Sequence, residues 1–296
     1  MNNISRLIFL IAFLLGGFSN VNAQNEGLTY GVFIAIDDYS EAVWKPLKTS
    51  VNDANAVAQV LSQKYVFDEI ITLYNKDATQ KNILNKLDEV ATKLTENDQL
   101  LIFYSGHGFE LGNEGYWVAF DAIDTDPLKM VSNTQFKKMI STTKAKHVLL
   151  MADACFSGTA FKASNLYIRN DGEEDYYKII SGLISRQAII SGSLEPTEDE
   201  NGEHSIFTKY LLKYLENNEN QYFSTSELYE LMKYPLAANS TAIPKFGHIQ
   251  NAGHEGGQFV FQLADIPVEE VVEVYQEEVP IVDCSTLKVE IEEGKK

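Results

Sequence analysis

The segment AKHVLLMADACFSGTAF (Ala145–Phe161) carries the strongest signal in the sequence for both architecture and chemistry. Its first half is a continuous apolar run that ends in Asp153, as expected for a strand buried on both faces of a sheet. Cys155 follows two residues later, before a turn of small residues. The chain has one other cysteine, Cys284. The thiol of Cys155 is therefore a small core residue, half of a disulfide, or a nucleophile.

Strand-like and helix-like segments alternate along the rest of the chain. Apolar runs predict further strands at residues 29–36, 69–75, 99–108 and 185–193, with a short strand pair or edge at 115–122 and a closing edge strand at 257–263. Helical spacing of apolar residues predicts helices at residues 50–61, 83–94, 133–140, 205–215 and 224–232, the last with a capping-box pattern. The polar segment 162–175 lacks periodicity and is expected to be an exposed loop. This alternation predicts an α/β fold around a mostly parallel sheet.

The two ends of the chain differ from this pattern. Arg6 is followed by the apolar stretch LIFLIAFLLGGF and then by Val21-Asn22-Ala23, a pattern typical of a secretory signal, with an uncleaved membrane anchor as the alternative. We therefore expect a signal peptide at 1–23, one domain at 24–264 and an acidic tail or linker at 265–296. The expected location is extracytoplasmic, either periplasmic or secreted, without stable membrane association after signal cleavage.

The charge of the chain restricts its partners. The formal net charge is −18, and removal of residues 1–23 takes away one positive charge to leave −19. Such acidity argues against nucleic acid or an anionic membrane as a partner. Two cysteines make at most one bridge, so the chain is not a disulfide scaffold. No pair of His or Cys residues has the spacing of metal ligands, which argues against a metal site.

Unusual residues follow two of the predicted strands. One strand runs into Ser105-Gly106-His107-Gly108 and the other into Asp153-Ala154-Cys155. The separation of 48 positions between His107 and Cys155 fits one helical crossover between neighbouring strands. Because active sites in parallel sheets form outside the carboxyl ends of the strands, both side chains are expected at one rim.

A thiol and an imidazole at the same rim form a plausible catalytic pair. A free thiol, with a pKa near ~8.5, is mostly protonated at neutral pH, whereas the thiolate is the nucleophile. The imidazole of His107 can accept that proton. The backbone N–H groups of Gly108 and Cys155 can donate to a developing oxyanion, where one donor stabilises a transition state by ~3 kcal/mol.

Each residue also has a purely structural interpretation. Cys155 alone can be a core residue, His107 alone a turn residue, and Asp153 the cap of a following helix. Their occurrence after two successive strands favours catalysis. The remaining histidines fit this role less well, because they lie inside a strand, in an acidic loop or beside glycine-rich turns: His147, His204, His248 and His254.

The motifs YSGHG and KHVLLMADACFSGTAF resemble those of caspase-like cysteine peptidases, in particular the bacterial and metacaspase-type branch. The resemblance extends to YGVFIAIDDYS, LKTSVNDANAVAQVL, GYWVAFDA, VSNTQFKKMISTTKAKHVLL and SRQAIISGSLEPTEDENGEHSIFTKYLLKYL, covering about residues 30–215. It implies a caspase–haemoglobinase-type three-layer sandwich and peptide-bond hydrolysis through an acyl-thioester. A cysteine at such a rim would be inactivated by pairing with Cys284, which makes the disulfide interpretation the weakest.

The resemblance also assigns roles to individual residues. It implies that Cys155 is the nucleophile, His107 the general acid/base and Gly108 an oxyanion-hole residue. Asp153, Asp53 and Ser105 match positions that line the pocket for the P1 side chain, which precedes the cleaved bond. The strand end at residues 190–193 would pair with the substrate backbone.

These positions imply a substrate preference. Two carboxylates in one pocket should accept Arg, perhaps Lys, and reject Asp, because burying a like charge is costly. Caspases that cleave after Asp have arginines there, whereas Arg169 and Arg186 lie elsewhere in the pattern. We therefore expect a peptide or protein substrate with a basic P1 residue.

Several alternatives stay open. The segment 162–178 offers Lys162, Arg169 and Lys178 as self-cleavage points. No cofactor is expected, although the acidic stretch Glu195–Glu203 is either a calcium site or, as favoured here, a solvated loop. The competing functions are a catalytically idle caspase-like module that binds partners, and a different cysteine hydrolase or transpeptidase on the same scaffold.

Overall fold

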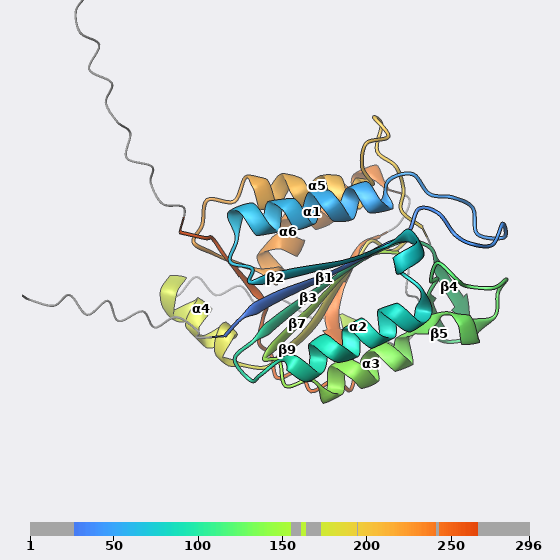
Figure 1. The fold of residues 1–296 in the computed structure, drawn as a ribbon. Helices are drawn as coiled ribbons and strands as arrows, with labels where there is room; N and C mark the ends of the chain where they lie inside the picture. Colours follow the sequence, from blue (N-terminus) through green and yellow to red (C-terminus); the bar gives the residue numbers. More distant parts are fainter. Residues whose placement is uncertain (1–26, 155–160, 164–172, 194, 241–242, 266–296) are drawn as a thin grey trace, which may run out of the picture. The chain divides into compact units, whose positions relative to one another are not determined.

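A seven-stranded sheet forms the centre of the protein (Figure 1). The structure is a computed structural model that describes residues 27–154, 161–163, 173–193, 195–240 and 243–265. In spatial order the strands of the sheet are β2 (Glu69–Tyr74), β1 (Thr29–Ala35), β3 (Gln99–Ser105), β7 (His147–Asp153), β9 (Ser185–Ile190), β11 (Lys245–Ile249) and β8 (Phe161–Ala163). The first five are mutually parallel, and β11 and β8 complete the sheet in antiparallel pairings. The predicted mostly parallel α/β fold is confirmed.

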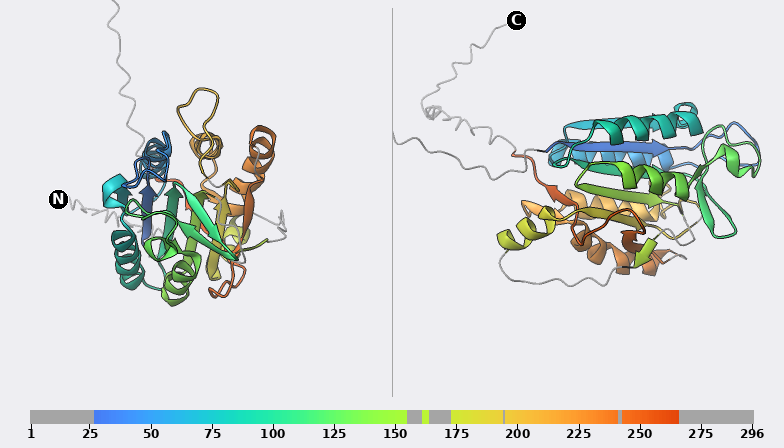
Figure 2. Two further views of the ribbon diagram at one scale, coloured as in Figure 1. Left: turned by 90° about the vertical axis from the view of Figure 1, so that its right-hand side faces the viewer. Right: turned by 90° about the horizontal axis from the view of Figure 1, so that it is seen from below.

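Helices cover both faces of this sheet, and Figure 2 shows the resulting layers from two further sides. One face packs against α1 (Ser50–Lys64), α5 (Ile206–Glu216) and α6 (Thr225–Asn239). The other packs against α2 (Gln80–Lys93) and α3 (Asn133–Thr142). A further helix, α4 (Glu173–Gly182), and two 3-10 turns, η1 (Asn75–Asp77) and η2 (Pro127–Lys129), lie outside these layers.

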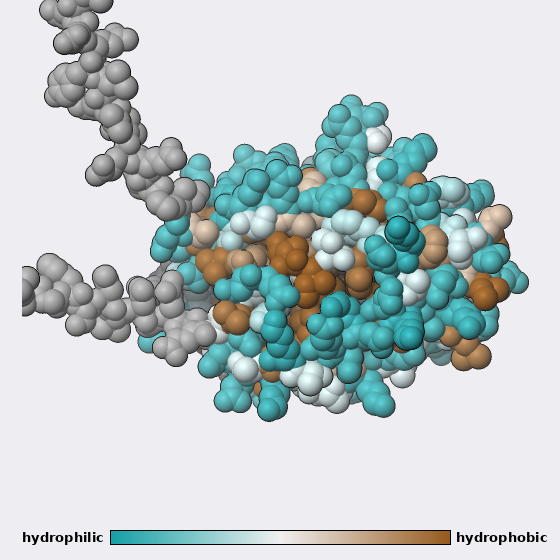
Figure 3. All heavy atoms as spheres, viewed as in Figure 1, coloured by the Kyte–Doolittle hydropathy of each residue, from teal (hydrophilic) through white to brown (hydrophobic). Residues whose placement is uncertain are grey.

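The alternation of strand side chains explains why the apolar runs are continuous. Successive side chains of a strand point to opposite faces. In β1, Val32 and Ile34 join the core beneath α2 and α3, whereas Phe33 and Ala35 join the core beneath α1, α5 and α6. Both faces are dry, so both sets must be apolar. Figure 3 shows hydrophilic residues over most of the helical layers and hydrophobic residues in a band between them.

Local signals mark several element boundaries. The capping box predicted at Ser224 is present, because its side chain accepts from the N–H of Glu227 while the Glu227 carboxylate accepts from the N–H of Ser224. Ser132 and Gln135 form a second capping box, at the start of α3. Ser205 caps α5 by accepting from the N–H of Thr208.

Two small antiparallel sheets lie beside the main one. The first, β4 (Gly108–Leu111), β5 (Glu114–Trp117) and β6 (Val131–Ser132), directly follows the end of β3. The second pairs β10 (Tyr222–Ser224) with β12 (Val260–Gln262). The expectation that residues 257–263 close the main sheet is therefore wrong. An apolar run looks the same whichever strand it pairs with, and the edge is formed instead by β11 and β8.

The segment 162–175, expected to be a loop, contains parts of a strand and a helix at its two described ends. Its start belongs to β8, which pairs with β11, and its last residues belong to α4. Polar composition concealed these elements because an edge strand and a surface helix need few apolar residues. Other predictions fall outside the described residues: the signal peptide 1–23, the tail from residue 266 onward with Cys284, most of the self-cleavage segment, and Cys155.

Candidate active site

The predicted site residues lie at the carboxyl ends of β3 and β7, which are neighbours as the spacing predicted. Ser105 and Asp153 are the last residues of these strands and are directly opposite in the register. His107 follows two residues after Ser105. Cys155 follows two residues after Asp153 but lies outside the described residues, so its pairing with His107 stays a prediction.

Tyrosine hydroxyls and aromatic rings, all uncharged, hold His107 in position. Its backbone N–H donates to Oη of Tyr39 at 2.8 Å, and its carbonyl accepts from Oη of Tyr104 at 2.7 Å. The rings of Tyr39 and Trp44 lie 5.1 and 5.7 Å from the imidazole, measured between centroids. The histidine is only 7% exposed, so its ring has little freedom to rotate.

The contacts of the His107 ring determine which nitrogen can act as a base. Nε2 lies 2.8 Å from the backbone carbonyl oxygen of Lys45. A carbonyl only accepts, so Nε2 carries the proton in this hydrogen bond. In the neutral imidazole Nδ1 then has a free lone pair. Nδ1 is therefore the atom that can take a proton from a nucleophile.

Glycine at position 106 is required by the packing beside His107. A Cβ atom there would lie 2.9 Å from the hydroxyls of both Tyr39 and Tyr104, closer than side chains allow. The same two hydroxyls hold the backbone of His107. The next glycine, Gly108, is buried at the start of β4, opposite Trp117. The chain thus turns sharply after β3 with the histidine at its apex.

A carboxylate lies beside Nδ1 of His107. Oε2 of Glu195 lies 3.2 Å from Nδ1 of His107, and the Glu195 side chain is 60% exposed. With Nε2 donating to Lys45, this contact requires a second proton on the ring, at Nδ1. Glu195 therefore lies against the nitrogen whose lone pair is free in the neutral ring. The sequence placed Glu195 only in an acidic loop.

Asp53, Asp153 and Ser105 gather beneath this rim, on the face of the sheet covered by α1 and α5. Asp53 lies in the first turn of α1 and is completely buried. Asp153 and Ser105 are also buried, at 1% and 0% exposure. Among the described residues, Oδ2 of Asp153 and Oγ of Ser105 have no hydrogen-bond partner. Such orphaned polar atoms are costly unless a ligand satisfies them.

The electrostatics of the two acids differ. Burial raises the pKa of Asp153 to about 7, and the charge of Asp53 adds to this rise, while Ser205 and Ser191 act against it. Burial also raises the pKa of Asp53, although hydrogen bonds from His204 and Ser205 act in the opposite direction. Asp153 is therefore close to its titration point at neutral pH. The two acids lie near enough for one charge to affect the other.

His204, which the sequence places in an acidic loop, contacts one member of this acid pair, Asp53. Its Nδ1 lies 2.7 Å from Oδ1 of Asp53. The N–H of the next residue, Ser205, also donates to Asp53, at 3.2 Å to Oδ2. The residues in contact are 151 positions apart in the chain, so no local pattern connects them.

The strand end at residues 190–193, expected to pair with substrate, is already partly occupied. Ile190 pairs with Lys245 of β11. A Cβ atom on Gly192 would lie 2.4 Å from the carbonyl oxygen of Ile243, so the backbone of that residue packs against the glycine. The expectation did not anticipate β11, whose position follows from pairings across the sheet.

Acidic side chains of the stretch 195–203 form ion pairs with lysine side chains. Glu198 forms an ion pair with Lys48 at 3.0 Å, and Asp199 lies 3.6 Å from Lys209. Among the described residues, no group of three His, Cys, Asp or Glu side chains is arranged to hold a metal ion. The calcium alternative therefore gains no support from this stretch.

The arginines considered for an Asp-specific pocket lie elsewhere. Arg186 is the second residue of β9, at the opposite end of the sheet from His107, where its guanidinium donates to the carbonyls of Ala145 and Lys146. Arg169 lies outside the described residues. In the described part of the chain, the acids Asp53 and Asp153 thus have a histidine beside them rather than an arginine.

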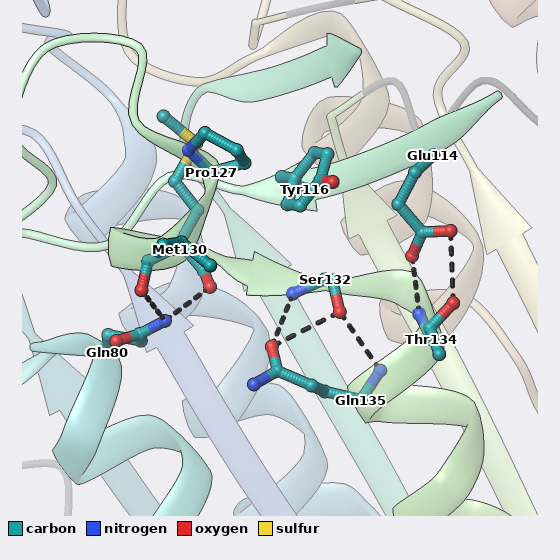
Figure 4. Close-up of a pocket in the computed structure, with 9 residues that line it drawn as sticks. Gln80, Glu114, Tyr116, Pro127, Met130, Ser132, Thr134 and Gln135 are labelled. Carbon is teal, nitrogen blue, oxygen red and sulfur yellow. Dashed lines mark hydrogen bonds between the residues drawn. The ribbon is translucent and has the colours of Figure 1, made fainter. Parts of the chain in front are cut away.

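A surface pocket lies away from the strand ends that hold His107 and Asp153, between β5, β6, η2 and the starts of α2 and α3 (Figure 4). Its volume is about 430 Å³. Its polar side chains bond to one another or to nearby backbone: Glu114 accepts from Thr134, and Gln80 donates to the carbonyl of Met130. We assign this pocket no role.

The helices in the described ranges are short or amphipathic compared with membrane-spanning helices. None of them combines sufficient length with sufficient apolar character.

Comparison with known proteins agrees with this architecture. A solved structure, protein GSU0716 from Geobacter sulfurreducens, is similar with a TM-score of 0.54 and 15% sequence identity, over 78% of this chain and 99% of that one. This likeness concerns the fold alone. Metacaspase-8 from Arabidopsis thaliana is 26% identical over 125 residues, which are 38% of this chain and 33% of that protein. The match thus spans about a third of the length of that curated relative.

The family comparison covers much more of the chain. The family model described as the caspase domain matches residues 30–288, which include the end of β3, the end of β7 and the first turn of α1. The expected resemblance is confirmed, and the chain belongs to the caspase-domain family.

Proposed function

We propose that this protein is a cysteine endopeptidase that cleaves after arginine, and less readily after lysine, with Cys155 as nucleophile and His107 as general acid/base. Membership of the caspase family implies cysteine peptidase activity. The observation that carries the substrate preference is the buried pair Asp53 and Asp153, with one carboxylate oxygen of Asp153 unpartnered among the described residues.

The proposed reaction follows from the orientation of His107. Its Nε2–H is engaged by the carbonyl of Lys45, so Nδ1 accepts the proton of the Cys155 thiol. The thiolate then attacks the carbonyl carbon of the substrate, and the imidazolium returns its proton to the leaving amine. Water hydrolyses the resulting thioester, again with the imidazole as base. The backbone N–H groups of Gly108 and Cys155 stabilise the oxyanion in both steps.

The proposed preference follows from the charge at the end of β7. A guanidinium that reaches Asp153 satisfies its free oxygen and stabilises the ionised carboxylate, because an opposite charge favours the charged form. Arginine has a planar fork of donors that matches a carboxylate and a neighbouring hydroxyl such as that of Ser105. An aspartate side chain would bring a second negative charge into a buried acidic site, at a large cost.

The setting of this activity is also proposed from the sequence. The apolar segment before Ala23 directs the chain out of the cytoplasm, and the protein acts there after cleavage of residues 1–23. The reaction needs no metal ion. Any effect of calcium is then an effect on activation rather than on the chemical step.

A peptide library that varies only the P1 residue tests the proposal. We expect the purified protein to hydrolyse Arg peptides best, Lys peptides less well and Asp peptides not at all. The same measurements with Cys155→Ala, with and without calcium, provide the control and the test of calcium dependence. Hydrolysis of Asp peptides but not of Arg peptides would overturn the assignment.

Alkylation distinguishes a peptidase from the idle module considered as the alternative. A chloromethyl ketone with Arg at P1 should modify Cys155 stoichiometrically, as read by peptide mass. Reaction at Cys284 alone, or no reaction, would favour the binding module.

A further inference from the structure

The contact between His204 and Asp53 places a titratable base inside the acidic site. Asp53 has no exposed surface and accepts from Nδ1 of His204 at 2.7 Å and from the N–H of Ser205. The His204 side chain is 22% exposed. One nitrogen of its ring therefore faces a buried carboxylate, while part of the ring still reaches solvent.

The groups around His204 come from three elements. On α1 lie Asp53 and Asn52, whose side-chain Nδ2 is 3.4 Å from Nδ1 of His204. In the loop before α5 lie Asp199 and Glu203, whose charges add to the effect of Asp53. On α5 itself, Lys209 pairs with Asp199 and Glu200. Acids thus outnumber cations around the ring.

This environment favours the protonated ring. The hydrogen bond to Asp53 raises the pKa of His204, with further contributions from the charges of Asp53, Asp199 and Glu203 against the opposing effect of burial. In the structure the positive charge that compensates Asp53 therefore comes from the protein itself.

Asp153 is in the opposite situation. It is 1% exposed, and its Oδ2 and the neighbouring Oγ of Ser105 have no partner among the described residues. Of the two acids, Asp53 is thus paired with a histidine, whereas Asp153 keeps an oxygen that a ligand can contact. Sequence position alone does not distinguish the two.

We propose that His204 is a specificity-determining residue that competes with the P1 cation for Asp53. This proposal rests on the proposed cleavage after basic residues. Protonated His204 neutralises Asp53, so the site presents one carboxylate to the substrate. When His204 loses its proton, the negative charge of Asp53 is no longer compensated, and the site attracts an arginine side chain more strongly.

The proposal predicts an effect on substrate binding rather than on the chemical step. The KM for an Arg peptide should fall as pH rises, with a contribution from His204 in addition to the ionisation of Asp153. In His204→Asn, the amide keeps a donor near the position of Nδ1 but carries no charge. We expect its KM at pH 6 to be lower than that of the wild type by about tenfold, corresponding to one charge interaction of about 1.4 kcal/mol.

The comparison needs two pH values and a matched control. At a pH above the titration of His204, located by NMR in the wild type, we expect the KM values of wild type and His204→Asn to agree within about twofold. The kcat values should agree at both pH values. His248→Asn, a half-buried histidine on β11 stacked on His254, should leave KM unchanged at both.

A direct measurement covers the case in which His204→Asn folds poorly. In the Cys155→Ala protein, a saturating peptide that ends in Arg should lower the pKa of His204, followed by NMR titration of its ring, because coupling between two cations is reciprocal. A peptide that ends in norleucine serves as the uncharged control. We expect no comparable change with that peptide.

The outcomes separate the two proposals. If the wild type cleaves no Arg or Lys peptide at any pH, the proposed function fails. If it cleaves Arg peptides while His204→Asn keeps the wild-type ratio of KM between pH 6 and a pH above the titration of His204, the role of His204 fails. An Arg peptide that binds Cys155→Ala without changing the titration of His204 would likewise overturn that role.

Discussion

Ser105 and Asp153 lie opposite each other at the carboxyl ends of the neighbouring parallel strands β3 and β7, both buried and each with an oxygen that lacks a partner among the described residues. Such a pair is unfavourable for folding and is expected where a ligand repays the cost. Function and stability should therefore oppose each other at Asp153.

Replacement of Asp153 by Asn should stabilise the protein at alkaline pH. In the folded state the pKa of Asp153 rises from 3.8 to about 7, so the folded protein binds this proton more tightly than the unfolded chain. The free energy of unfolding then falls between pH 4 and 7. At about 1.4 kcal/mol per pKa unit the loss is about 4 kcal/mol at most.

Urea unfolding at pH 4 and pH 8 measures this effect. Asp153→Asn should match the wild type at pH 4 and exceed it at pH 8, while its cleavage of Arg peptides falls. Asp88→Asn, an exposed acid on α2, is the control. A variant less stable than the wild type at pH 8 would mean that the ionised carboxylate is compensated in the free protein.

Replacement of Tyr39 by Phe should affect the positioning of His107. The hydroxyl of Tyr39 accepts from the backbone N–H of His107 at 2.8 Å. Loss of that acceptor leaves a buried donor unsatisfied, at a cost of about 1–3 kcal/mol in unfolding free energy. We expect kcat to fall more than KM rises, since the lost hydrogen bond holds the backbone of His107.

Thermal unfolding and steady-state kinetics together check the Tyr39 prediction. Tyr234→Phe removes a hydroxyl from a side chain that is 73% exposed and should change neither quantity. An active Tyr39→Phe protein with unchanged stability would show that the hydrogen bond contributes little to the position of His107.

Replacement of Glu195 by Ala should increase activity. The Glu195 carboxylate lies 3.2 Å from Nδ1 of His107, the nitrogen that we propose accepts the thiol proton. An exposed ion pair contributes about 0.2–1 kcal/mol, so its removal should raise kcat/KM by up to about fivefold. Glu198→Ala, which breaks the ion pair with Lys48 in the same loop, is the matched control.

The opposite result for Glu195 would be equally informative. A fall in kcat/KM with Glu195→Ala, but not with Glu198→Ala, would mean that Glu195 orients the imidazolium during the reaction instead of competing with Cys155.

Replacement of His107 by Ala should slow the alkylation of Cys155. If Nδ1 of His107 stabilises the thiolate, iodoacetamide should react with Cys155 at pH 6 at least about tenfold faster in the wild type than in His107→Ala. A Cys284→Ser background restricts the signal to one thiol. Equal rates in the two proteins would refute a functional contact between His107 and Cys155.

Most elements of the fold were predictable because their signals are local. The continuous apolar run of β1 reflects two dry faces, and the capping box at Ser224 starts α6 within four residues. The adjacency of β3 and β7 followed from a short crossover. The strands β11 and β12 were missed or misassigned because pairing between distant segments depends on the whole sheet.

The candidate site divides in the same way. The motifs around His107 and Asp153 are contiguous in sequence, so residue type and position at a strand end were sufficient to single them out. The sequence does not show which groups these residues contact in the folded protein. The carbonyl of Lys45, 62 positions away in the chain, accepts from the imidazole of His107. Every residue has such a carbonyl, so the sequence does not indicate which one the imidazole contacts. His204 contacts Asp53 only because the start of α5 packs beside the start of α1. Burial, which places the pKa of Asp153 near neutrality, is a property of the folded chain, since desolvation requires the surrounding layers to be assembled.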